Sequence, residues 1–370
     1  MISIQKFSTL GIKPDKETRR STRAYIDTGK LCNYDCEFCY YKDQLDQRDT
    51  LKQVLDRISY AADYGCDSID MCGGEPSIEP NFFKYLKHAV QVGMKGISCI
   101  SNGSKFCNME FLKKSKEFGL SEILFSLHGY DKESHEKITK RKGSFEKIIQ
   151  AIHNAHELGM TVRVNCTVYD VNAPGLVDKY PELIKTLNPL EVNFIALKYD
   201  SDNSDFRKVH YSEIIDNIKI SIDKLKDSVK YLNIRFIPFC YAKGYEKHVV
   251  NHYQHVYDIF DWNRATYNQG YPIKNYTEEE YLKNDYEMAA WFRTEGFHKE
   301  ESCRKCKYFY ICDGIDKQLK GQELTPIPGD KINDPNHFRK GFYDVNDSYL
   351  NPQKTWVIPK MPIERIKEYS

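Results

Sequence analysis

The sequence lacks a long hydrophobic run, an excess of charge of either sign, internal repeats and low-complexity segments. No apolar stretch approaches the roughly 18 residues that a membrane-spanning helix needs, so a membrane protein is not expected. Residues 1–16 become charged after a few apolar positions, which does not fit a secretory signal, and the cytoplasm is the expected compartment. A formal net charge of +1 also lacks the basic excess typical of proteins whose main partner is nucleic acid.

Cysteine, by contrast, is abundant, with 12 in 370 residues. Because nothing indicates export, we do not expect disulfides to pair them. Six of the 12 fall in two short groups, near residues 35 and 307. Clustered cysteines in a reducing compartment more often hold a metal or an iron–sulfur cluster than one another. The sequence therefore predicts two separate metal-binding segments.

Short β-branched runs alternate with longer amphipathic stretches from about residue 22 to 240. Such alternation predicts an α/β fold with a parallel sheet and helices outside it, either an open doubly wound sheet or a full or partial (β/α) barrel. After residue 240 the alternation stops. The expected strands are 23–27, 67–72, 96–101, 122–127, 162–168, 191–197 and 233–239.

Four regions follow from this pattern. Residues 251–292 are rich in aromatics without a clean period, and the cysteines near residue 307 come after them. We expect these residues to belong to a small, irregular extension organised by its cysteines. The expected regions are a lead-in (1–21), an α/β domain (22–240), a cysteine-rich extension (241–323) and a C-terminal tail (324–370).

The first cysteine group reads LCNYDCEFCYY and places Cys32, Cys36 and Cys39 at the spacing C-x3-C-x2-C. A structural zinc site takes four ligands, whereas a [4Fe–4S] cube held by three thiolates leaves one iron free to bind another molecule. The group follows the first expected strand, so it lies at the carboxyl end of the sheet, where α/β folds place their chemistry. The alternatives are half a zinc site completed by a distant ligand, or plain core cysteines.

This cysteine motif, with the aromatic Phe38 before its third cysteine, resembles the signature of the radical S-adenosylmethionine (SAM) superfamily. The resemblance covers about residues 22–240 and implies a partial (β/α)6 TIM-like barrel. It departs from the family at His128, where aspartate is commoner. Four further segments match in order, each at the end of an expected strand: CGGEP (72–76), SNG (101–103), SLHGYDKESHEKITKRKGSFEKII (126–149) and VNCTV (164–168).

The resemblance implies two cofactors, a [4Fe–4S] cluster on Cys32, Cys36 and Cys39, and SAM bound to its fourth iron. In the family, the reduced cluster cleaves SAM to a 5′-deoxyadenosyl radical, which abstracts a hydrogen atom from the substrate. A reducing partner such as flavodoxin or ferredoxin supplies the electron. The residues that the resemblance implies as SAM contacts are Phe38, Gly73, Gly74, Glu75, Ser101, Ser126, Arg141, Asn165 and Leu197.

The implied roles differ along this set. Phe38 would lie against the adenine, the Gly-Gly-Glu segment 73–75 would meet the methionyl amine, and Asn165 would reach the ribose. Glycines in that segment would let the backbone approach the ligand closely. Several of these residues also have ordinary structural alternatives: a helix cap for Ser126, a solvated charge for Arg141, a strand end for Asn165 and the core for Leu197.

The second cysteine group reads CRKCKYFYICDG and spaces Cys303, Cys306 and Cys312 as C-x2-C-x5-C, while Cys240 ends the last expected strand. Four thiolates are enough to close a cluster or a zinc site. The layout resembles the shortened "twitch" form of the SPASM auxiliary-cluster extension appended to radical SAM barrels, and it implies one auxiliary [4Fe–4S] cluster. A structural zinc, or simple burial in the case of Cys240, are the alternatives.

For the reaction, we expect a hydrogen atom to be taken from a small polar substrate such as a sugar, nucleoside or amino-acid derivative. The aromatic stretch 251–292 is a candidate part of the substrate pocket, or else packs against the barrel. Only 31 residues precede Cys32, too few for the leader-binding domain of peptide maturases. The related GTP cyclase of molybdenum-cofactor synthesis has a glycine-rich tail, whereas this chain ends IKEYS.

Two alternatives stay open. One is a peptide-modifying (RiPP) maturase that uses a detached leader-recognition partner. The other is a non-catalytic iron–sulfur or zinc-binding protein, which would account for both cysteine groups but not for an open cluster beside a SAM-type glycine segment. Cleavage of SAM to 5′-deoxyadenosine separates the enzyme from the binding protein.

Overall fold

A computed structural model gives the architecture. It describes residues 23–39, 41–63, 66–197, 210–251, 254, 264–266, 297–316, 319, 322–332, 334, 337–339 and 341–343.

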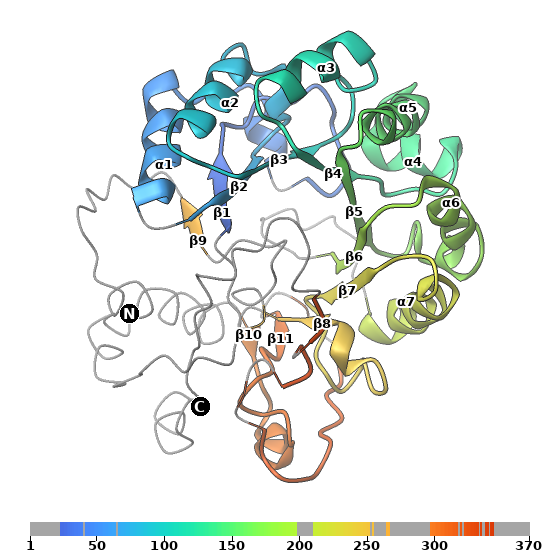
Figure 1. Cartoon of the computed structure of the whole chain (residues 1–370). Helices are drawn as coiled ribbons and strands as arrows, with labels where there is room; N and C mark the ends of the chain where they lie inside the picture. Colours follow the sequence, from blue (N-terminus) through green and yellow to red (C-terminus); the bar gives the residue numbers. More distant parts are fainter. Residues whose placement is uncertain are drawn as a thin grey trace.

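One parallel sheet organises the chain, and it curls into an open half barrel (Figure 1). Its nine strands lie in the order β8-β7-β6-β5-β4-β3-β2-β1-β9, and every neighbouring pair is parallel. The strands are β1 (Arg23–Asp27), β2 (Ser68–Cys72), β3 (Gly96–Ser101), β4 (Glu122–Ser126), β5 (Thr161–Val168), β6 (Glu191–Ala196), β7 (Tyr231–Arg235), β8 (Val249–Val250) and β9 (Arg264–Thr266).

Helices cover the outer face of this sheet (Figure 1). Each strand from β1 to β6 is followed by at least one helix before the next strand, which confirms the expected partial (β/α)6 barrel. The helices are amphipathic, because they must bury one face against the sheet. They are α1 (Leu51–Asp63), α2 (Phe82–Gln91), α3 (Met109–Glu117), α4 (Lys132–Thr139), α5 (Ser144–Glu157), α6 (Lys179–Leu187) and α7 (Tyr211–Leu225).

The expected strands match the observed ones closely except at the last. The predicted bounds 233–239 are wrong, because β7 spans Tyr231–Arg235 and the next residue, Phe236, has a φ of 64°. A positive φ on a bulky side chain cannot continue an extended strand, so the chain turns there. The sheet also extends past residue 240, since β8 pairs with β7 and β9 pairs with β1.

The cysteine-rich extension contains little regular structure. A two-stranded antiparallel sheet, β10 (Phe297–His298) with β11 (Ile315–Asp316), brackets the segment of the second cysteine group. Apart from residues 251, 254 and 264–266, the aromatic stretch 251–292 lies outside the described residues. Among the residues that the structure describes, no helix combines the length and apolarity needed to cross a bilayer.

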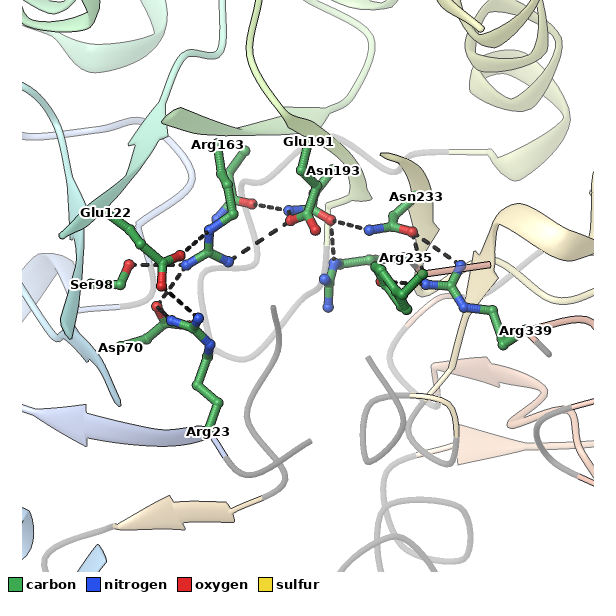
Figure 2. Close-up of polar contacts among 12 residues, drawn as sticks. Arg23, Asp70, Ser98, Glu122, Arg163, Glu191, Asn193, Asn233, Arg235 and Arg339 are labelled. Atoms are coloured by element: carbon green, nitrogen blue, oxygen red, sulfur yellow. Dashed lines mark hydrogen bonds and ion pairs between the residues drawn. The ribbon is translucent and has the colours of Figure 1, made fainter. Parts of the chain in front are cut away.

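The barrel interior is charged where a small barrel is usually apolar (Figure 2). Arg23 pairs with Glu122 at 2.7 Å and with Asp70 at 3.1 Å, and Arg163 pairs with Asp70 at 2.8 Å. All four side chains are at most 1% exposed. Burial opposes the charge of each guanidinium, but the two carboxylates raise the pKa of Arg23. This network joins β1, β2, β4 and β5 at the amino-terminal side of the barrel.

Candidate functional site

The first cysteine group lies in the loop that follows β1, at the carboxyl end of the sheet. The backbone N–H of Cys32 donates to the Leu45 carbonyl at 3.0 Å, and that of Cys39 donates to the Cys36 carbonyl at 3.0 Å. These bonds close the loop on itself. Sequence reasoning placed the motif at this end of the sheet, and the structure confirms that position.

The three cysteines are half-buried, and none forms a disulfide. Burial raises the pKa of the Cys32 thiol to about 11, and burial together with Cys32 and Cys39 raises the pKa of Cys36. Thiolates in this loop therefore need a nearby positive charge, which a bound iron centre supplies. Among the described residues, no three Cys, His, Asp or Glu side chains are arranged to hold a metal ion.

The Gly-Gly-Glu segment after β2 packs against the backbone of the cysteine loop. The N–H of Gly74 donates to the Gly29 carbonyl at 2.9 Å, and the N–H of Glu75 donates to the Leu31 carbonyl at 2.7 Å. A Cβ on Gly74 would come within 2.1 Å of the Leu31 oxygen, and one on Gly73 within 2.1 Å of the Gly29 oxygen. The glycines thus make room for the cysteine loop itself, a reason that the sequence prediction, based on ligand approach, did not include.

Glu75 joins the ends of two strands through its carboxylate. It is 1% exposed and accepts hydrogen bonds from the Ser77 N–H at 3.1 Å and from the Ser77 hydroxyl. It also accepts from the Ser101 hydroxyl at 2.9 Å and from the Asn102 N–H at 2.6 Å. Burial raises the pKa of Glu75, and these donors oppose that shift. Contact of Glu75 and Ser101 with SAM stays a prediction.

Asn102 is a site residue that sequence reasoning missed, although it stands inside the SNG segment. Besides holding Glu75 by its N–H, its side-chain amide donates to Asn33 Oδ1 at 3.0 Å. Its Nδ2 also lies 4.0 Å from the Cys32 sulfur. Asn33 in turn donates to the Ser104 hydroxyl at 3.0 Å. The end of β3 is thereby tied to the cysteine loop, and the only signal in the sequence was a polar residue at a strand end.

Ser126 and Asn165 are register neighbours at the carboxyl-terminal part of β4 and β5, and both are half-buried. Asn165 Oδ1 accepts a hydrogen bond from Asn193 Nδ2 at 3.0 Å. Leu197 is only 5% exposed and belongs to the hydrophobic core. Ser126 and Asn165 therefore lie side by side at the carboxyl end of the sheet, whereas Leu197 packs in the core. Contact of these three residues with SAM stays a prediction.

Arg141 is exposed and follows α4. The segment before it contacts the cysteine loop, because the Glu37 N–H donates to the Ile138 carbonyl at 2.8 Å and Lys140 pairs with Glu37 at 3.1 Å. Arg141 therefore lies one residue from Lys140 and three from Ile138, both of which contact the loop that carries the three cysteines. Its pairing with a SAM carboxylate stays a prediction.

Phe38 packs against two aromatic rings from other strand ends. Its ring centroid lies 4.8 Å from that of His128 and 5.9 Å from that of Tyr169, both edge-on. His128 Nδ1 accepts from the Thr167 N–H at 3.1 Å, and burial lowers the pKa of His128 to about 3. Where related sequences more commonly carry an aspartate, this chain therefore holds a neutral ring against Phe38.

The second cysteine group comes together from distant parts of the chain. Burial raises the pKa of Cys240, and the thiols of Cys306 and Cys303 add to that effect. The Ile327 N–H donates to the Cys306 sulfur at 3.4 Å, and the Gly314 N–H donates to the Cys312 sulfur at 3.4 Å. Backbone donors to sulfur are typical surroundings of iron–sulfur ligands. Ligation by these four cysteines stays a prediction.

Comparisons with known proteins agree with this geometry. Residues 26–172 match the family model described as the Radical SAM superfamily. Molybdenum cofactor biosynthesis protein 1 of Bos taurus is 30% identical over 215 residues, covering 55% of this chain and 33% of that protein. A probable GTP 3′,8-cyclase of Saccharolobus islandicus is 29% identical over 170 residues, covering 45% of this chain and 54% of that protein. The chain thus spans between a third and about half of these relatives.

One solved structure is similar over most of the chain. Native anSMEcpe with AdoMet and a peptide bound aligns with a TM-score of 0.53 at 15% identity, covering 86% of this chain and 96% of that one. At this identity the likeness shows the fold alone. The matched segment 26–172 contains the cysteine loop, the Gly-Gly-Glu segment and the ends of β3, β4 and β5. Over residues 26–172 the chain is therefore similar to the radical SAM superfamily, whose members bind a [4Fe–4S] cluster and SAM.

Proposed function

We propose that this chain is a radical SAM enzyme that cleaves SAM reductively and abstracts a hydrogen atom from a small polar substrate. The observation that carries the proposal is the hydrogen-bonded joint at the carboxyl end of β1, β2 and β3. There the Glu75 carboxylate and the backbone of residues 29–31 fix the cysteine loop to two neighbouring strand ends. A cluster ligand set needs this rigidity if it is to hold one molecule in a single orientation.

The donor types present suit the implied cofactors, and binding of the cluster would have to bring the three thiols of the loop together. Cys32, Cys36 and Cys39 offer three soft ligands on one closed loop, without a fourth cysteine in that loop. When bound, the cluster and SAM supply the electron transfer and the radical that removes hydrogen from the substrate. The chain's own residues position them: Glu75, Ser101 and Asn102 brace the loop, while Phe38, Ser126 and Asn165 line the adjoining strand ends as the proposed SAM contacts.

The proposed substrate is a sugar, nucleoside or amino-acid derivative. Among these, the printed names of the curated relatives, which include a probable GTP 3′,8-cyclase, favour a nucleoside or nucleotide. A peptide substrate is the second candidate, because a similar structure, of which this chain covers 96%, was solved with a peptide bound. A panel of nucleosides, nucleotides, sugars and peptides deuterated at non-exchangeable, carbon-bound positions identifies the class by deuterium transfer to 5′-deoxyadenosine.

We further propose one auxiliary [4Fe–4S] cluster on Cys240, Cys303, Cys306 and Cys312. The support is the spacing of the four cysteines in the sequence and the backbone N–H groups that donate to the sulfurs of Cys306 and Cys312. The Cys240→Ala variant tests the least expected ligand. Loss of cluster iron in this variant supports the assignment, whereas unchanged iron removes Cys240 from the ligand set.

The first experiment counts iron and sulfide per chain in protein prepared without oxygen. The same count is made on the variant with Cys32, Cys36 and Cys39 all changed to alanine. We expect about eight irons to fall to about four, from four irons in each cube. Production of 5′-deoxyadenosine from SAM by the reduced wild type, and not by the variant, supports the proposed enzyme. An intact chain that binds no iron after reconstitution contradicts the proposal.

A further inference from the structure

A row of asparagines crosses the barrel interior beside the proposed SAM contacts. Asn165, Asn193 and Asn233 are register partners on the neighbouring strands β5, β6 and β7. Asn193 and Asn233 are at most 1% exposed. Figure 2 shows the side chains of Asn193, Asn233 and Arg235 pointing toward one another in the barrel interior. A buried amide row of this kind needs every polar atom to find a partner.

The orientation of the Asn193 amide is determined by charged neighbours. Its Oδ1 accepts from Arg235 Nε at 3.0 Å and from Asn233 Nδ2 at 2.9 Å. Its Nδ2 donates to Glu191 Oε1 at 2.7 Å and to Asn165 Oδ1 at 3.0 Å. The flipped amide would set an NH2 group against a guanidinium and a carbonyl against a carboxylate. Electrostatics therefore allows only one orientation.

This orientation is passed on to Asn165. Because Asn165 Oδ1 accepts from Asn193 Nδ2, the amide of Asn165 is oriented so that its NH2 group, a pure donor, is available to a ligand. Within the described part of the chain, Asn165 makes no other side-chain hydrogen bond. The side chain is half-buried and stands in register with Ser126, whose hydroxyl can donate or accept. A fixed donor beside a hydroxyl suits a ligand that carries hydroxyl or other acceptor oxygens.

We propose that Asn193 is a positioning residue, which holds Asn165 so that the Asn165 NH2 donates to an acceptor oxygen of bound SAM. Glu191 and Arg235 act behind it as the charged anchors of the amide orientation. The inference rests on the proposed function, since it assigns a role toward SAM. It adds residues on β6 and β7, beyond the matched segment 26–172, to the determinants of SAM binding.

The test measures SAM affinity by equilibrium dialysis on the full, cluster-reconstituted chain. Asn165→Ala removes the donor, and we expect the Kd for SAM to rise roughly tenfold, as the loss of one good hydrogen bond predicts. Asn193→Ala should raise the Kd roughly three- to tenfold. The double variant should bind no more weakly than Asn165→Ala alone, because Asn193 acts through Asn165.

Asn165→Asp tests the amide orientation directly and does not depend on any change at the buried position. It keeps an acceptor for Asn193 Nδ2 but replaces the donor with an oxygen. We expect it to lose SAM affinity as much as Asn165→Ala does. If Asn193→Ala does not fold, Asn193→Ser replaces it. We then expect the Kd for SAM to rise as well, but by less.

Asn154→Ala is the matched control. Asn154 is also a buried amide, 3% exposed, and it lies on α5, outside the barrel interior. Its side chain donates to the Phe106 carbonyl at 3.1 Å and to the Cys107 carbonyl at 3.0 Å. Its removal should lower the Tm but leave the Kd for SAM within about twofold.

Three results would overturn the inference: wild-type affinity in Asn165→Asp, wild-type affinity in a folded Asn193 variant, or losses that multiply in the double variant. These outcomes are separate from failure of the proposed function. A wild-type chain that binds no SAM and produces no 5′-deoxyadenosine rejects the enzyme itself. A wild-type chain that binds SAM, with variants that bind equally well, rejects only the role of Asn193.

Discussion

The two cysteine groups are built in different ways. The first occupies one loop of eight residues from Cys32 to Cys39, and this loop is braced by the ends of β2 and β3. The second combines Cys240, which follows β7 in the chain, with a segment that begins 63 residues later, at Cys303. The first group is therefore local in sequence and braced by side chains from other strands. The second is distant in sequence and surrounded by backbone N–H donors.

This difference shows which kind of site is readable from one sequence. A local motif carries its ligand geometry in its spacing, so the family model finds it within residues 26–172. A site assembled from distant segments depends on how β7, β10 and β11 are placed, and spacing alone leaves its fourth ligand undetermined. If the two groups are independent, a change in one should leave the other intact.

The largest expected effect comes from Gly74→Ala. The added Cβ would lie 2.1 Å from the Leu31 carbonyl oxygen and 2.5 Å from the Lys30 carbonyl oxygen, and backbone atoms cannot move away cheaply. We expect iron to fall from about eight to about four per chain, and 5′-deoxyadenosine production to fall at least about a hundredfold. Iron analysis and a SAM-cleavage assay measure both. Gly244→Ala is the control for backbone strain without a clash, because Gly244 has a φ of 85° but nothing lies within 4 Å of its Cβ.

The reciprocal change in the second region is Gly314→Ala. Gly314 has a φ of 91°, and a Cβ there would lie 2.1 Å from the His298 carbonyl oxygen. Its N–H also donates to the Cys312 sulfur. We expect about four irons to remain and SAM cleavage to stay within about tenfold of wild type, since the first loop is untouched. Loss of all iron would show instead that the two regions form one cooperative unit.

Sequence reasoning predicted the alternation of strands and helices and the position of each motif at a strand end, because buried strands and amphipathic helices leave strong periodic signals. It did not predict what holds the motifs in place. Glu75 was assigned to SAM, yet its carboxylate accepts bonds from three residues of the chain. Such bonds depend on the relative height of two strands, a property that no single segment encodes.

The barrel interior illustrates the same limit. In the sequence, Arg23, Glu122 and Arg163 are charged residues within apolar runs, and their spacing gives no sign of partnership. Only the parallel register brings them together, at distances of 2.7 and 3.2 Å. Phe236 is a local example, because its positive φ ends β7 where the β-branched pattern predicted continuation.

A smaller effect is expected for Glu75→Gln, which tests how the first group is braced. The glutamine keeps the size of the side chain but places an NH2 where an oxygen now accepts from the Asn102 N–H at 2.6 Å. We expect the Kd for SAM to rise about ten- to a hundredfold, with the iron count unchanged, as the loss of a hydrogen bond to a charged group predicts.

The matched control for this change is Glu79→Gln. Glu79 is also a buried carboxylate, 6% exposed, and its Oε1 has no hydrogen-bond partner among the described residues. The Glu79→Gln variant should bind SAM with the same Kd as the wild type. Equal affinity in Glu75→Gln would mean that the carboxylate does not brace the site.

The smallest expected effect is on the pH dependence of the stability, and it comes from two buried histidines. Burial lowers the pKa of His128, which packs against Phe38, to about 3. Burial also lowers the pKa of His248, which directly precedes β8, to about 4. The unfolded chain takes up these protons near pH 6.5, whereas the folded chain does not, so stability is lost as the pH falls through 6.5 toward the folded values. Between pH 7 and 5 each histidine should account for about 2 kcal/mol of that loss.

The variants His128→Gln and His248→Gln should each remove their share of this loss, because glutamine does not titrate. Urea unfolding at pH 7 and 5 measures the difference. If the chain unfolds as one unit, both variants flatten the pH dependence of the same transition. Because His248 is hydrogen-bonded to the Leu232 carbonyl of β7, both variants should flatten the barrel's transition even if the cysteine-rich extension unfolds separately. A pH dependence that neither variant changes would show that these histidines have the same pKa in the folded and the unfolded chain, and would contradict the lowered values.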